Sequence, residues 1–273
     1  MKIISKTLIA ATLFIGIGTL AGCNTQVKTA DENLTQPTEK QLLDWSYSGK
    51  TGPANWGDIK PAYTISKTGK AQSPINIDSK AAQTNTKMSA ITYQYQPTSF
   101  QLIRTDKLVQ ATAQPAKGRP DSTITTGGKV YTLKTINIHT PAEHTIDKQQ
   151  AVAEIQLVHK SKDNKTVIVS VFLKKGAENK ALGDLTSAIA SSPNNKEVPL
   201  KTTISTLGLL PTNEEHFTYQ GSYTTPPTTE GITWFVYRTA ISISNKQLEQ
   251  LKSKLANNNR PVQKQNERVI YQN

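Results

Sequence analysis

The stretch VYTLKTINIHTPAEHTIDKQQAVAEIQLVH, residues 130–159, decides the fold because it contains two runs that alternate between apolar and polar side chains. A period of two is typical of a β-strand, whose successive side chains point to opposite faces of the sheet. In the first run, Thr135, Asn137 and His139 share one face, and Ile136 and Ile138 share the other. This run therefore predicts a strand with a polar row on one face.

The second run, AVAEIQLVH, places Glu154 and Gln156 on one face and His159 on the other by the same alternation. If the two strands pair, Asn137, His139 and Gln156 converge on one face of the sheet. The sequence therefore predicts its chemistry at this pair of strands.

The rest of the chain continues the β pattern. Further strands rich in Val, Ile and Thr are predicted, for example at 91–95 and 166–173. Helical periodicity appears at 181–190 and 244–255, where Ser244 and Gln247 form a capping-box pattern. We expect a mainly β fold, one domain over residues 41–273, and both helices at its periphery.

The N-terminus reads as a lipoprotein signal peptide over residues 1–22. Lys2 and Lys6 precede an apolar core, which ends in Leu-Ala-Gly immediately before Cys23. We expect lipid on Cys23, as diacylglycerol and palmitate, followed by a polar tether over residues 23–40. The protein is then exported and anchored to the cell membrane or the outer membrane, facing the extracytoplasmic side. The alternative is an ordinary buried cysteine behind a chance apolar run.

The composition also limits the partners and the chemistry. Removing Lys2 and Lys6 with the signal peptide leaves +10 of the formal net charge of +12, which attracts polyanions. Outside a cell the candidates are anionic polysaccharides, cell-wall polymers and membrane head groups, and we expect no nucleic acid. The alternative is a merely solvated basic surface. Cys23 is the only cysteine, so the mature domain has no disulfide or thiolate site.

Several short motifs follow one another along most of the chain. They lie at 45–56 (WSYSGKTGPANW), 72–77 (QSPINI), 137–139 (NIH), 142–145 (AEHT), 154–159 (EIQLVH), 221–227 (GSYTTPP), 233–234 (TW) and 259–263 (NRPVQ). In these motifs the chain resembles the α-carbonic anhydrases, and the last one matches the family pattern N-x-R-P-x-Q to within a residue. The resemblance implies a large central, mostly antiparallel twisted sheet with short peripheral helices.

The resemblance also shows where this chain departs from the family. The three zinc-binding histidines of the family correspond here to Asn137, His139 and Gln156, and a glutamine that orients one of them corresponds to Thr135. Neutral carboxamides are weak zinc ligands, so we expect no cofactor, and without zinc no hydroxide forms near neutral pH. A rebuilt metal site of His139, Glu154 and water is the alternative, in which case zinc is the cofactor.

Other positions of the family site are retained. The resemblance implies that Thr224 takes the place of the threonine beside the zinc hydroxide, and that Glu143 is its buried carboxylate partner. It implies that Glu154 and His144 are supporting residues behind the ligands. The alternative is that Glu143, Glu154 and His144 persist only because buried polar groups need partners for the fold to be stable. The residues implied to line the pocket are Val158, Ile168, Tyr223, Thr225, Ile232, Trp234 and Lys107, the last near the position of the family's proton-shuttling histidine.

Three functions follow from these expectations. The first is a surface lipoprotein that has lost zinc-dependent CO2 hydration and binds an anionic glycan or cell-wall polymer. The second is an active α-carbonic anhydrase, converting CO2 and water to bicarbonate, with a remodelled metal site. The third is a small-ligand site between Thr224 and His139. Serine hydrolase, nucleotide-binding and zincin motifs are absent from the sequence, and Glu143 with Asp147 is only a weak pattern for glycoside hydrolysis.

Overall fold

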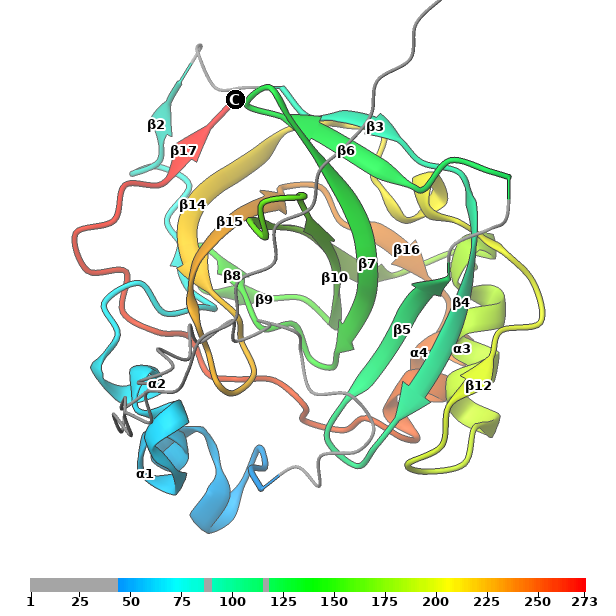
Figure 1. Ribbon diagram of the computed structural model, residues 1–273, viewed down its shortest axis with the longest axis horizontal. Coiled ribbons are helices and arrows are strands. Elements are labelled where there is room, and N and C mark those ends of the chain that lie inside the picture. The colour runs from blue at the N-terminus through cyan, green and yellow to red at the C-terminus, as the bar shows by residue number, and fades with distance from the viewer. Residues whose placement is uncertain (1–43, 86–89, 115–117) are drawn as a thin grey trace, which may run out of the picture. The chain divides into compact units, whose positions relative to one another are not determined.

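The computed structural model describes residues 44–85, 90–114 and 118–273. The signal peptide, Cys23, the tether and the predicted domain boundary at residue 41 lie outside these residues. Within the described ranges the fold is built on one large sheet of 14 strands and a smaller sheet of three (Figure 1). No helix in these ranges combines the length and the apolar character needed to cross a membrane.

The strands of the large sheet are mostly short and rich in β-branched residues. They are β2 (Gln83–Thr84), β3 (Thr92–Gln94), β4 (Pro97–Arg104), β5 (Val109–Gln114), β6 (Thr123–Thr126), β7 (Lys129–His139), β10 (Ala153–Lys160), β11 (Thr166–Lys175), β12 (Val198–Pro199), β13 (Ile204–Ser205), β14 (His216–Ser222), β15 (Glu230–Tyr237), β16 (Ile241–Ile243) and β17 (Tyr271–Gln272). The small sheet joins β1 (Asn76–Ile77), β8 (Thr145–Ile146) and β9 (Gln149–Gln150).

The main path of the sheet runs β12-β4-β5-β7-β10-β11-β15-β14-β17-β2. The pairs from β4 to β11 are antiparallel, as is the pair of β15 with β14. β11 pairs in parallel with both β15 and β16, so the sheet is mixed rather than purely antiparallel. The predicted strands at 130–139, 151–159 and 166–173 are confirmed as the central strands β7, β10 and β11.

The helices are short. They are α1 (Trp56–Ile59), α2 (Ile65–Thr68), α3 (Gly183–Ser191) and α4 (Asn245–Lys252), with 3-10 turns at Gly49–Thr51, Pro53–Asn55, Pro61–Tyr63, Lys180–Leu182 and Thr206–Leu209. The side chains of Ser244 and Gln247 form the predicted capping box of α4. Figure 1 shows α3 and α4 together at one side of the sheet, beside β4 and β12.

The two faces of the central strands support two separate apolar clusters. One face carries Ile136, Ile155 and Leu157, which pack with Leu185 of α3 and Leu251 of α4. The opposite face carries a second cluster, and its members on the strands and the loop after β14 include Val158, Ile168, Tyr223, Ile232 and Trp234. The second face is the one on which the sequence predicts the polar row.

Candidate functional site

The register of β7 and β10 brings the predicted site residues together. Gln156 lies directly opposite Asn137, and Glu154 lies directly opposite His139. All four side chains are at most 3% exposed. Residues directly opposite in an antiparallel pair have their Cβ atoms about 5 Å apart, so these polar groups lie close together and away from water. The convergence predicted from the alternation is confirmed.

Asn137 is held by a residue that the motifs did not reveal. Gln110 of β5 lies opposite Asn137, and its Nε2 donates to Asn137 Oδ1 at 3.1 Å. The side-chain oxygen of Asn137, its only atom with metal-binding capacity, is thereby engaged with another amide.

Gln156 turns its amide nitrogen toward two buried carboxylates. Its Nε2 donates to Glu143 Oε2 at 2.8 Å and to Glu154 Oε1 at 3.1 Å. An ionised carboxylate only accepts hydrogen bonds, so the amide nitrogen rather than the amide oxygen must face Glu143 and Glu154. The nitrogen of an amide offers no lone pair to a metal. Gln156 therefore satisfies the carboxylates in place of an imidazole.

His139 is oriented by Asn258. The Nδ1 of His139 lies 2.7 Å from the backbone oxygen of Asn258 and donates to it, which leaves Nε2 3.5 Å from Glu143 Oε2. The side chain of Asn258 accepts from the backbone N–H of Thr140 and donates to the backbone oxygen of Ile138. The asparagine of the N-x-R-P-x-Q pattern is thus Asn258, one residue before Asn259, at which the motif was placed from the sequence.

Glu154 is the centre of a buried hydrogen-bond network. Its Oε2 accepts from the backbone N–H groups of Glu143 and His144, and its Oε1 lies 2.8 Å from His144 Nδ1 and from Ser170 Oγ. Burial alone would raise the pKa of the Glu154 carboxyl, but the imidazole and the backbone N–H of His144 outweigh burial and lower it to about 2.

The network continues beyond His144. Its Nε2 lies 2.7 Å from Tyr219 Oη, which in turn lies 2.8 Å from Ser73 Oγ. His144 is therefore fully engaged behind the site, as the resemblance implies. His159 points to the opposite face, where its Nε2 lies 2.8 Å from Tyr95 Oη.

Glu143 is tied to the C-terminal segment through Arg260. Its Oε1 accepts from the backbone N–H of Arg260 at 2.9 Å. The Arg260 guanidinium is buried, donates to Gln72 Oε1 and the backbone oxygen of Ser73, and lies over the Trp56 ring at 5.3 Å. Burial lowers the pKa of the Arg260 guanidinium to about 10, against the opposing effect of the Glu143 carboxylate.

Thr224 differs from its implied role. It is 3% exposed, but among the described residues no hydrogen bond joins it to Glu143, whose oxygens accept from Gln156 and Arg260 instead. Asp147 is also separate from Glu143, because its carboxylate accepts from the backbone and side chain of Ser79. The paired carboxylates needed for glycoside hydrolysis are therefore not formed by these two residues.

Five of the residues implied to line the pocket belong to one buried apolar cluster, and their place in a pocket wall stays a prediction. One cluster contains Val158, Ile168, Tyr223, Ile232 and Trp234.

Tyr223 of this cluster and two further predicted pocket residues, Thr225 and Lys107, lie in segments outside the strands. The Oη of Tyr223 lies 3.2 Å from Thr166 Oγ1, and Thr225 is buried. Lys107 lies in the turn between β4 and β5, three residues before Gln110.

The donors at the three family ligand positions are not the three imidazoles of the family. The three family ligand positions supply one imidazole, one amide oxygen bonded to Gln110 and one amide nitrogen bonded to Glu143 and Glu154. Among the residues that the structure describes, no group of three or more His, Cys, Asp or Glu side chains is arranged to hold a metal ion. The residues present do not fit the family's tetrahedral zinc.

Comparison with known proteins agrees with the motifs and the fold. The family model for eukaryotic-type carbonic anhydrases matches residues 51–273. The chain belongs to the α-carbonic anhydrase family. A carbonic anhydrase of Nostoc sp. is 31% identical over 240 residues, covering 87% of this chain and 89% of the relative.

Two solved structures show the fold of the family in similar chains. The α-carbonic anhydrase of Thermovibrio ammonificans, in complex with sulfanilamide, gives a TM-score of 0.77 at 32% identity, covering 83% of this chain and 98% of the other. Dioscorin complexed with ascorbate also gives 0.77, at 28% identity, covering 84% and 97%.

Sequence reasoning missed four residues of the site: Gln110, Asn258, Arg260 and Tyr219. The N-x-R-P-x-Q pattern contained a signal for Asn258 and Arg260. Gln110 and Tyr219 lie on β5 and β14 without a motif that points to the site. Their contacts depend on strand register and so could not be found from local pattern.

Proposed function

We propose that this member of the α-carbonic anhydrase family has lost zinc-dependent CO2 hydration and acts as a binding protein for an anionic polysaccharide or cell-wall polymer. One observation carries the loss of activity. The amide nitrogen of Gln156, at a ligand position, donates to both Glu143 and Glu154. A zinc ion would need a lone pair where this chain presents N–H groups.

The same contacts explain how the fold tolerates the loss. Glu143 and Glu154 are each at most 1% exposed, and buried carboxylates are costly unless they are paired and hydrogen-bonded. The Gln156 amide donates to both carboxylates. The backbone N–H of Arg260 donates to the other oxygen of Glu143, and the backbone N–H groups of Glu143 and His144 donate to the other oxygen of Glu154. The polar site is then stable as a hydrogen-bonded network that requires no metal ion.

The charge of the chain supports a binding role. The formal net charge of +12 gives the protein a field that concentrates anionic polymers. We place the protein outside the cytoplasm, anchored to a membrane by lipid on Cys23, where polysaccharides and cell-wall polymers are the abundant polyanions. The dioscorin structure complexed with ascorbate supports ligand binding as a use of this fold.

An active carbonic anhydrase with a remodelled metal site is the second candidate. It is favoured by the relatives, several of which are named carbonic anhydrase, and by His139, whose Nδ1 bond to Asn258 leaves Nε2 facing Glu143. This candidate requires a tightly bound metal in the parent chain.

Two measurements on the purified full chain test the proposal. Metal content by mass spectrometry, with CO2 hydration assayed on the same sample, should give no bound zinc and no hydration above the uncatalysed rate. A stoichiometric metal together with hydration would overturn the loss of activity. Retention on a sulfated polysaccharide resin at low salt should be strong and should fall as salt rises. Absence of retention at low salt would remove the binding role.

A further inference from the structure

A small cavity opens where β7 changes partners. Residues Thr135–Asn137 of β7 pair with β5, and residues Lys129–Thr132 pair with β6. Between these pairings the register with β10 shifts, since Val158 lies opposite Thr135 but His159 lies opposite Leu133. Lys134 is therefore an extra residue in β7, and such bulges re-aim side chains.

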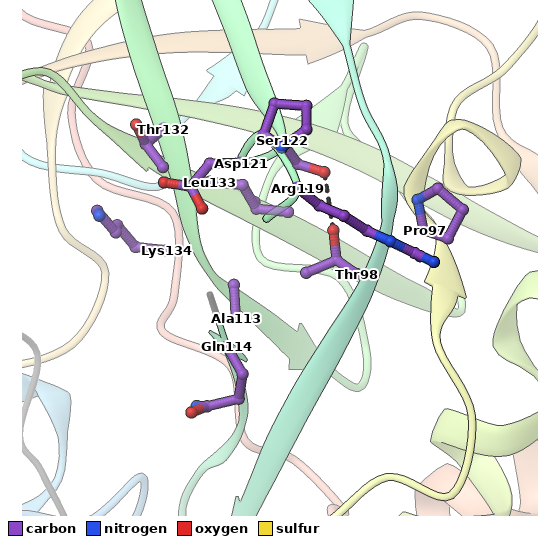
Figure 2. A pocket seen from close by; sticks show the side chains of 11 residues that line it. Pro97, Thr98, Ala113, Gln114, Arg119, Asp121, Ser122, Thr132, Leu133 and Lys134 are labelled. Atoms are coloured by element: carbon purple, nitrogen blue, oxygen red, sulfur yellow. Dashed lines mark hydrogen bonds between the residues drawn. The ribbon is translucent and has the colours of Figure 1, made fainter. Parts of the chain in front are cut away.

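The cavity at this bulge is polar and small. Its volume is about 50 Å³, and Gln114, Arg119, Asp121, Ser122, Thr132 and Lys134 are among the residues that line it (Figure 2). A cavity that holds one water needs about 10–15 Å³ of such volume, so this cavity has room for one small charged group.

Three charged side chains surround the cavity. Figure 2 shows Asp121 on the side of Thr132 and Lys134, whereas Arg119 extends across to Pro97. None of Arg119, Asp121 and Lys134 takes part in an ion pair within the described residues. The hydroxyls of Thr98 and Ser122, in contrast, bond each other at 2.8 Å. The charges of Arg119 and Lys134 are therefore not neutralised by an ion pair within the described residues.

A further cation lies beside Lys134. Lys160 of β10 is opposite Thr132, two residues along β7 from Lys134. The pKa of Lys160 is lowered by burial and then by the positive charge of Lys134. Two positive charges near each other repel. An anion bound at Lys134, which lines the cavity whereas Lys160 does not, relieves that repulsion.

We propose that Lys134, Lys160 and Arg119 form the contact point for an anionic polysaccharide, with one sulfate or carboxylate group of the polymer in the cavity at the β7 bulge. This inference rests on the proposed binding function and names its site. Cations on both sides of the cavity suit successive anionic groups along a chain better than a single free anion. Asp121 opposes the binding and limits its strength.

The test is chromatography of the full chain on immobilised heparin, comparing the salt concentration at elution. Lys134→Gln and Arg119→Gln should each weaken binding by about 2- to 5-fold, the effect of losing one exposed ion pair. Asp121→Asn should strengthen it. Lys201→Gln, an exposed lysine beside a different cavity near α3, removes the same charge and is the matched control. It should change elution less than Lys134→Gln does.

The outcomes separate this inference from the function on which it rests. No retention of the parent at low salt overturns both. Retention of the parent with equal losses in Lys134→Gln and Lys201→Gln overturns the site alone, because net charge would then explain the binding. Two competitors added at equal ionic strength complete the test. The polysaccharide is overturned as the ligand if inorganic sulfate displaces the chain from the resin as well as soluble heparin does. It is also overturned if double-stranded DNA binds the chain with the same ranking of variants.

Discussion

Replacing Gln156 by methionine tests whether its amide supports the two buried carboxylates. Methionine is close to glutamine in length and volume, so the substitution removes the N–H groups with little change in packing. The two lost bonds, at 2.8 Å to Glu143 and 3.1 Å to Glu154, both have charged acceptors. A hydrogen bond to a charged group contributes about 1.5–3 kcal/mol, so the free energy of unfolding should fall by about 3–6 kcal/mol near neutral pH.

The loss should depend on pH. The pKa of Glu154 is lowered to about 2 in the folded protein, below its value of about 4.3 in the unfolded chain. Its ionised form therefore contributes stability above about pH 4.3, and this contribution is lost as the pH falls toward about 2. Without the Gln156 donor the pKa of Glu154 in the folded protein rises, so the difference in free energy of unfolding between parent and variant should narrow as Glu154 becomes protonated.

Urea unfolding at about pH 7 and about pH 3 measures this difference. Gln110→Met is the control, because Gln110 is also buried but its bond to Asn137 has a neutral acceptor and contributes about 0.5–1.5 kcal/mol. Two results would refute the argument that Gln156 stabilises buried charge. One is a loss in free energy of unfolding that is the same for Gln156→Met and Gln110→Met. The other is a loss for Gln156→Met that is unchanged at low pH.

Three other predictions follow from the site. The double variant Asn137→His, Gln156→His should restore three imidazoles and bind about one zinc ion per chain, measured by mass spectrometry, whereas the parent should bind none. A double variant without metal would show that the surrounding residues also prevent zinc binding. Burial lowers the pKa of His159 to about 3, so the unfolded chain, with a histidine pKa of about 6.5, takes up a proton first and stability falls as the pH drops from about 6.5 toward 3. His159→Phe should flatten the urea-unfolding profile over that range, and an unchanged slope would assign it to other groups. Arg260→Met should lower the free energy of unfolding by about 3–6 kcal/mol, because it removes two hydrogen bonds from the buried guanidinium, to Gln72 and to the backbone oxygen of Ser73, at about 1.5–3 kcal/mol each. A loss no larger than that caused by replacing an exposed arginine would contradict this role.

The sequence by itself determined the elements and the faces of this protein. Alternation in residues 130–159 predicted which side chains of β7 and β10 share a face, and the capping box of α4 was visible in Ser244 and Gln247. Both are local properties of the backbone, since side-chain direction repeats every second residue in a strand and a cap involves residues three apart. The motifs likewise predicted that Asn137 and Gln156 stand at ligand positions.

Only the tertiary structure decided what those side chains do. Gln156 donates to Glu143 across a loop, Asn258 orients His139 from 119 positions along the chain, and the bulge at Lys134 opens a cavity that no motif marks. Such contacts depend on strand register and on how distant segments close over the sheet. A buried polar group must find a partner wherever the fold provides one, and that partner is set by the three-dimensional arrangement rather than by the neighbouring sequence.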